Sequence, residues 1–228
     1  MTAPTPPSPS PPFDWAIYAD ATLAGLAVLI PIPFVDGWVE GIFRRRMPHA
    51  IATRRGYMLT PALVALLNNG NSSFFDYFWG CLLLPFRLIF ELIVQLSRKL
   101  LYFLTIKRAI DALNYYWQRA FLLDYMLQRG YLDELENAPL ALSALEQTLR
   151  ATTASPLTQL ARQIIFGPFR IMRSLWHMIR GQRDVEIDET RQEMARSWNR
   201  FADFFDSLAH RYEQIYDDAA TRTRNAAL

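Results

Sequence analysis

Between Pro85 and Gly130 the chain contains neither proline nor glycine, the two residues that most strongly interrupt helices. Apolar residues recur in this stretch with helical spacing and define one face: Ile106, Ile110, Leu113, Trp117, Ala120 and Leu127. Upstream, polar residues recur at every fourth position as a narrow stripe: Arg87, Glu91, Gln95 and Lys99. The pattern predicts one long helix or two stacked helices, ending at Gly130.

A second helical pattern occupies the C-terminus, over about Asp188–Thr221. Its apolar residues alternate spacings of four and three, which is typical of a coiled-coil-like seam: Met194, Trp198, Phe201, Phe205, Leu208, Tyr212 and Ile215. No segment competes with strand-like alternation. We therefore predict an all-α fold, a multi-helix bundle with an apolar hairpin and a long C-terminal amphipathic helix.

Proline placement divides the chain into three parts. Residues 1–12 are rich in proline and predict a disordered tail. Residues 13–73 predict an apolar helical hairpin broken by prolines, and residues 74–228 predict a long-helix bundle that ends in the heptad helix.

The predicted hairpin has two helices of different character. The first covers Asp14–Ile30 and is strongly apolar from its second turn onward. Pro31 and Pro33 interrupt it, because proline lacks an amide donor and clashes with the preceding turn. A second, amphipathic helix is expected from Asp36 to Arg55, with Gly56 as its stop.

Two apolar segments, Ala21–Val35 and Phe74–Ile93, approach the length of a membrane span. Two prolines interrupt the first and three charged residues interrupt the second, so neither predicts a clean span. Arginines closely follow the first segment, as expected for the cytoplasmic side of a membrane. From this position we assign these residues to lipid headgroups: Arg44, Arg45, Arg46, Arg54 and Arg55.

The segment Ala161–Arg183 carries basic residues and no acidic ones. Arg170, Arg173 and Arg180 fall on one helical stripe and are further candidates for headgroup binding. Bulky residues fill the opposite side and predict a membrane-facing surface: Phe169, Met172, Leu175, Trp176 and Ile179. This pattern is typical of an interfacial helix on anionic lipid, and a bundle helix with a solvated arginine face is the alternative.

Asp36 and Glu40 lie one helical turn apart, with His49 further along, which raises the question of a metal or acid–base site. Helix capping by Asp36 and a charge pair of Glu40 with Arg44 explain the same residues more simply. No phosphate loop, nucleophile elbow or Cys/His array occurs in the sequence. We therefore expect no catalytic residues, no metal and no cofactor, and the net charge of +2 gives no bias toward nucleic acid.

Residues Gly25–Gly56 read GLAVLIPIPFVDGWVEGIFRRRMPHAIATRRG, in which Pro31-Ile32-Pro33 is followed by Asp36 and later by a basic end. This pattern resembles a helical-hairpin domain of unassigned function that occurs in bacterial inner-membrane proteins and at the C-termini of some GTPases. The resemblance covers about a seventh of the chain. The chain has no GTPase module, so the resemblance implies association with a bacterial inner membrane and no nucleotide activity.

We therefore expect a non-enzymatic, membrane-associated helical scaffold or adaptor on the cytoplasmic face of the inner membrane, attached peripherally or as an inserted hairpin. The first charged residue is Asp14, so the N-terminus lacks the basic start of a secretory signal. The expected partners are anionic lipid and, through the C-terminal helix, another protein or a second copy. Two alternatives stay open: a helical bundle that binds lipid or another hydrophobic ligand, and a soluble homo-oligomeric structural protein.

Overall fold

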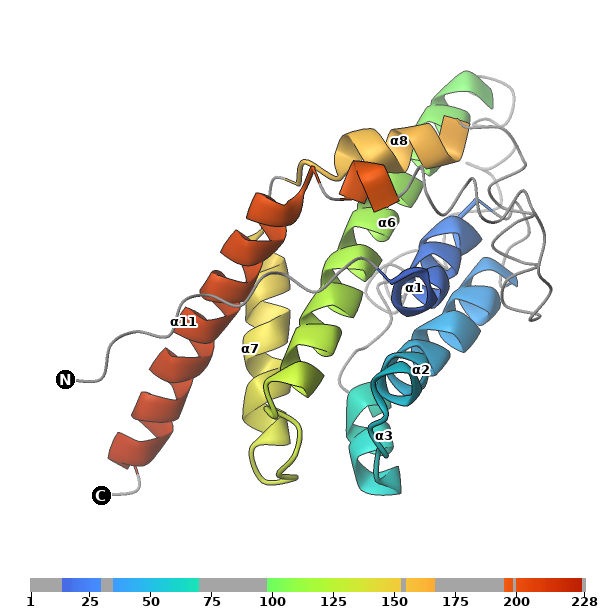
Figure 1. Ribbon diagram of the computed structural model, residues 1–228. Coiled ribbons are helices and arrows are strands. Elements are labelled where there is room, and N and C mark those ends of the chain that lie inside the picture. The colour runs from blue at the N-terminus through green and yellow to red at the C-terminus, as the bar shows by residue number, and fades with distance from the viewer. Residues whose placement is uncertain are drawn as a thin grey trace, which may run out of the picture.

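The computed structural model describes residues 14–29, 35–69, 98–152, 155–166, 195–198 and 200–226. Its helices are α1 (Trp15–Ala27), α2 (Val35–Arg55), α3 (Pro61–Asn69), α6 (Arg98–Gln128), α7 (Ala138–Ala151), α8 (Thr158–Phe166) and α11 (Ala202–Ala226). The described residues contain no β-strand, and the predicted all-α bundle is confirmed. Figure 1 shows the helices arranged around α6.

The long helix α6 is the centre of the bundle. Helices α1, α2, α7, α8 and α11 all pack against it, with α7 and α11 on one side and the α1–α2 hairpin on the other (Figure 1). Side chains on several faces of α6 are therefore buried, including Leu113, Trp117, Leu122 and Met126. This explains why its sequence is apolar over much more than one stripe. The core of the described residues is continuous from α1 to α11.

Helix α1 lies between α2 and α6 and is buried along almost its whole length. Its apolar composition therefore corresponds to a helix covered on several sides by protein. No helix in the described part of the chain is long and apolar enough to cross a membrane. The segment Phe74–Ile93, the second apolar run of the sequence, lies outside the described residues.

Polar bonds in the core hold α1 and α2 against α6. The indole Nε1–H of Trp117 donates to Thr22 Oγ1 at 2.9 Å, and the Thr22 hydroxyl donates to the backbone oxygen of Tyr18 at 2.8 Å. The Tyr116 hydroxyl donates to the buried carboxylate of Glu40. A buried polar group without a partner is costly, so these bonds favour one arrangement of the three helices.

The helix ends follow local sequence signals. The Asp14 carboxylate caps α1 by accepting from the Ala16 amide at 3.1 Å. Gly56 and Gly130 have φ of +75° and +74°, the left-handed conformation that glycine adopts without a Cβ penalty. In both cases the next residue donates back across the last turn, as Tyr57 does to the Ala52 oxygen at 2.9 Å, which is the Schellman arrangement. The predicted stops at Gly56 and Gly130 are confirmed.

The C-terminal helix differs from the expected Asp188–Thr221. Helix α11 begins at Ala202, after a turn at Arg200 and Phe201, and it continues to Ala226. The turn separates α11 from a helical segment over residues 195–198 (Figure 1). The expectation of one unbroken helix is therefore wrong at this point.

Trp198, which lies directly before this turn, packs in the core. Its ring centroid lies 4.3 Å from that of Tyr18 in α1 and 5.9 Å from that of Trp117 in α6, while it also stacks on Phe205 at 4.8 Å. The backbone amides at the turn keep partners, because Arg200 donates to the Ser197 oxygen at 3.3 Å and Phe201 to the Trp198 oxygen at 2.8 Å. The Trp198 ring joins the segment before α11 to both α1 and α6.

Candidate functional site: the pocket and outer face of the α1–α2 hairpin

A solvent-open pocket of about 550 Å³ lies between α1 and α2. Its lining is Ala16, Ala19, Asp20, Arg46, His49, Ala50, Thr53 and Arg54. The α2 residues occur at spacings of three and four and therefore share one helical stripe. Alanines on both helices leave the hollow, because no larger side chain fills the space between them.

Asp20 in the wall of this pocket is 2% exposed, although it is ionisable. Neither of its carboxylate oxygens has a hydrogen-bond partner among the described residues. The Arg46 Nε lies 3.3 Å from Asp20 Oδ2, so the carboxylate has an ion pair to a half-exposed cation. Burial raises the pKa of the Asp20 carboxyl to about 6, and the positive charge of Arg46 opposes that rise.

The rim of the pocket carries donors from α2. The Arg54 Nε lies 2.5 Å from Asp14 Oδ2, and about half of the arginine side chain is exposed. His49 and Thr53 are also exposed. The ion pairs of Arg46 and Arg54 are both made through Nε, while a guanidinium has five N–H groups in all. The rim can therefore donate to an oxyanion.

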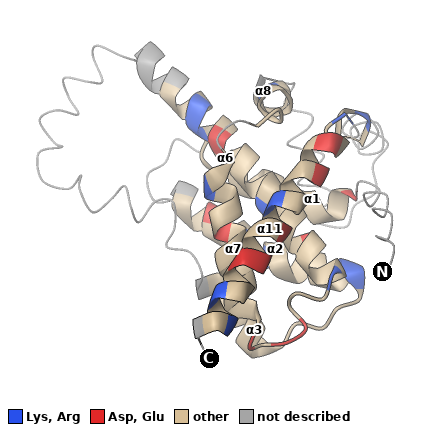
Figure 2. Cartoon of the chain, turned by 90° about the vertical axis from the view of Figure 1, so that its left-hand side faces the viewer, with Lys and Arg blue, Asp and Glu red and all other residues tan. Residues whose placement is uncertain are grey.

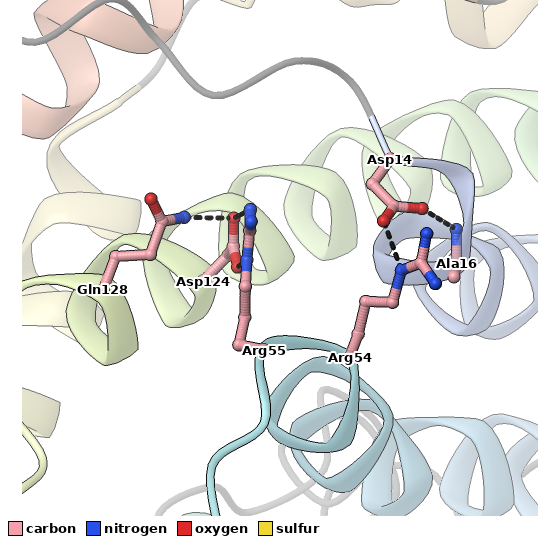
Figure 3. A network of polar contacts seen from close by, with 6 residues as sticks. All are labelled: Asp14, Ala16, Arg54, Arg55, Asp124 and Gln128. Carbon is pink, nitrogen blue, oxygen red and sulfur yellow. Dashed lines mark hydrogen bonds and ion pairs between the residues drawn. The ribbon is translucent and has the colours of Figure 1, made fainter.

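Adjacent arginines of α2 point to different helices (Figure 3). Arg54 reaches Asp14 at the start of α1, whereas Arg55 forks onto Asp124 of α6 with two bonds of 2.7 Å. Gln128 donates to the same Asp124 carboxylate at 2.7 Å, and that carboxylate is only 4% exposed. Arg55 therefore ties the end of α2 to α6, and its fork is already occupied.

The outer face of α2, as we define it, consists of Trp38, Ile42, Arg45, Arg46 and His49. Trp38 is 69% exposed and Ile42 is 42% exposed, although both are large apolar side chains. Glu40, which was considered for a metal or acid–base site and assigned to a charge pair with Arg44, is buried and accepts from the Tyr116 hydroxyl, while His49 is exposed at the pocket rim. The part of the chain that the structure describes holds no cluster of three metal-ligating side chains.

The predicted headgroup-binding arginines separate into distinct environments. Arg45, Arg46 and Arg54 are exposed, Arg44 is partly buried, and Arg55 is committed to Asp124. Lys, Arg, Asp and Glu residues are interspersed over the described helices (Figure 2). The remaining predicted lipid-binding residues lie outside the described part of the chain: Arg170, Arg173, Arg180, Phe169, Met172, Leu175, Trp176 and Ile179.

The C-terminal seam packs inside the molecule. Trp198, Phe205, Leu208 and Tyr212 are buried in the core, and Phe201 and Ile215 pack against it. Helices α6 and α7 cover this side of α11. Met194, the first predicted member of the seam, lies outside the described residues.

The sequence pattern gave Asp20 no functional role. A single acidic residue in an otherwise apolar helix was the available signal, but its place beside Arg46 depends on how α1 packs on α2. No family model, curated protein or solved structure matches this chain. The arrangement of the hairpin is therefore the basis for a functional proposal.

Proposed function

We propose that this protein is a non-enzymatic scaffold or adaptor that attaches peripherally to an anionic membrane surface through the outer face of α2. The observation that carries the proposal is the exposure of Trp38 and Ile42 on the same helix face as Arg45. Exposed large apolar side chains beside cations are typical of helices that lie in a lipid interface. The cytoplasmic face of a bacterial inner membrane is the location that we propose.

The chemistry of this face matches an anionic lipid surface. Tryptophan prefers the headgroup level of a bilayer, where its ring is partly buried and its N–H stays in a polar region. Each arginine near an anionic surface contributes about 1 kcal/mol of attraction. Glu40 is buried, so its side chain does not reduce the positive charge of the outer face.

The two alternatives have less support from the described residues. Aromatic side chains of the core fill the interior by contacting one another, as Phe121 does with Phe205 at a centroid distance of 4.7 Å. The pocket described above is lined by charged and polar groups as well as alanine. The packing of the C-terminal seam on α6 and α7 also gives no support to assembly through that seam.

Sedimentation of the full chain with vesicles tests the proposal. Binding to vesicles that contain phosphatidylglycerol should exceed binding to pure phosphatidylcholine, and high salt should reduce it because salt screens the arginines. Trp38→Ser should weaken binding about tenfold, which corresponds to about 1.4 kcal/mol.

Leu135→Ser is the matched control, because Leu135 is 51% exposed and lies in the connection between α6 and α7, outside α1 and α2. It should bind as the unaltered protein does. The proposal is wrong if the protein does not bind anionic vesicles, or if the Trp38 and Leu135 variants bind them equally well.

A further inference from the structure

The α1–α2 pocket has a carboxylate at its inner end and guanidinium groups at its rim, so the two ends suit ligand groups of opposite charge. Inside, the Asp20 carboxylate is buried and accepts no hydrogen bond from the described residues. Buried carboxylates are normally bonded to several donors, so this group is incomplete as it stands. A primary ammonium carries three N–H donors and a positive charge, and it would supply what the Arg46 Nε, at 3.3 Å, does not.

The rim of the pocket has the complementary character. The Arg46 and Arg54 side chains are about half-exposed there, and Thr53 also lines the pocket. Guanidinium groups bind phosphate oxygens with strong, charge-assisted hydrogen bonds. The Arg46 guanidinium lies beside Asp20 and can therefore bind a phosphate group at the rim, while Arg54 lies more than two helical turns further along α2.

The pocket is large enough for a short linker between an ammonium at Asp20 and a phosphate at the rim. Ala16, Ala19 and Ala50 form small apolar walls, which suit methylene groups. The volume of about 550 Å³ exceeds that of a small headgroup, and the opening to solvent allows the rest of a larger molecule to extend outward. A metal cation suits the pocket poorly, because its lining offers one carboxylate and two arginines.

We infer that this pocket binds a phosphodiester that carries a primary ammonium, the chemistry of a phosphoethanolamine group, with the ammonium on Asp20 and the phosphate on Arg46. The group can belong to a membrane lipid or to a soluble molecule. Its assignment to a lipid headgroup rests on the proposed function, whereas recognition of the free group does not.

Calorimetric titration of the full chain with soluble diesters tests the recognition itself. Glycerophosphoethanolamine should bind at least tenfold more tightly than glycerophosphocholine, whose quaternary ammonium has the same charge but no N–H donor. Glycerophosphoglycerol, which lacks the cation, should also bind at least tenfold more weakly. Equal affinity for the three compounds, or no binding of glycerophosphoethanolamine, would overturn the inference.

Three variants check the location. Asp20→Asn keeps the size of the side chain but removes its charge, and Ala50→Leu fills the pocket without changing any charge. Both should lose the preference for the ethanolamine compound. Arg45→Gln is the control, because Arg45 is exposed on α2 but does not line the pocket, and it should keep that preference. Circular dichroism checks that both pocket variants fold. If both folded variants keep the preference for the ethanolamine compound, the assignment of the ligand to this pocket is wrong.

Vesicle binding separates this inference from the proposed function. Adding phosphatidylethanolamine to anionic vesicles should strengthen binding of the unaltered protein but not that of Asp20→Asn. Trp38→Ser should lose vesicle binding while its affinity for soluble glycerophosphoethanolamine stays unchanged. If the soluble compound binds and vesicles do not, the proposed membrane attachment fails and the pocket assignment stands, with a soluble ligand as the source.

Discussion

Asp20 carries a negative charge into the interface between α1 and α2, where it lacks the hydrogen bonds that usually stabilise a buried carboxylate. Residues that destabilise a fold and yet occupy a pocket are frequent at binding sites, because the unfulfilled interaction is available to a ligand. The charged or titratable groups that line the pocket with it are Arg46, His49 and Arg54.

The raised pKa of Asp20 predicts how stability depends on pH. This pKa is about 6 in the folded protein and 3.8 for an ordinary aspartate. Between these values the folded protein binds more protons than the unfolded chain, so this group makes stability fall as pH rises through that window. The difference between these two pKa values corresponds to about 3 kcal/mol, by which the group destabilises the folded protein above pH 6.

Asp20→Asn should therefore be more stable than the unaltered protein near neutral pH and nearly equal to it near pH 4. Urea unfolding across this range measures the difference. Asp111→Asn is the control, because Asp111 is an exposed aspartate of α6. Its free energy of unfolding should differ little from that of the unaltered protein across this pH range. If the free energies of unfolding of Asp20→Asn and the unaltered protein differ by the same amount at all pH values, the pKa of Asp20 is not raised.

The neighbouring residues Arg54 and Arg55 should contribute differently to stability, because their carboxylate partners differ in burial. Arg55→Ala leaves the Asp124 carboxylate buried without its charged partner, and loss of one member of such a pair costs about 3 kcal/mol. Arg54→Ala breaks a pair with a half-exposed arginine, which costs about 1 kcal/mol or less. Urea unfolding of both variants should show this order, and equal losses would contradict the structural role of Arg55.

At the scale of elements, the packing of α1 on α6 depends on a close approach at Gly25. A Cβ placed on Gly25 would lie 2.8 Å from the Leu113 Cα and 2.7 Å from its Cδ2, which is closer than any real contact allows. The backbone of α6 would have to move, so the two helices have their present spacing only with glycine there.

Gly25→Ala should lower the free energy of unfolding by about 1–3 kcal/mol, as overpacked cores do. Gly41→Ala is the matched control, because it lies inside α2 with nothing within 4 Å of its added Cβ. It should raise stability by about 0.5–1 kcal/mol, since alanine restricts the unfolded chain more than glycine does. Thermal or urea unfolding of the two variants should therefore show opposite signs, and the same sign would contradict the observed helix spacing.

In the whole molecule, the burial of α1 favours peripheral attachment to a membrane over insertion of the hairpin. Its apolar side chains are covered by α2 and α6, so inserting the hairpin into lipid would require separating it from the core. Attachment through exposed residues such as Trp38 and Arg45 needs no such rearrangement. This is why we favour peripheral attachment over the inserted hairpin that the sequence also allowed.

The sequence by itself determined the all-α class and several helix ends, because capping by Asp14 and the left-handed conformation of Gly56 and Gly130 are local properties. Only the tertiary structure decided the partners of the ionisable residues. Arg55 pairs with a residue 69 positions away, and Asp20 meets Arg46 through the packing of two helices. Periodicity also did not show the turn before α11, beside which Trp198 contacts Tyr18 of α1. Periodicity identifies the buried face of a helix, but which charged groups meet there depends on contacts between distant segments.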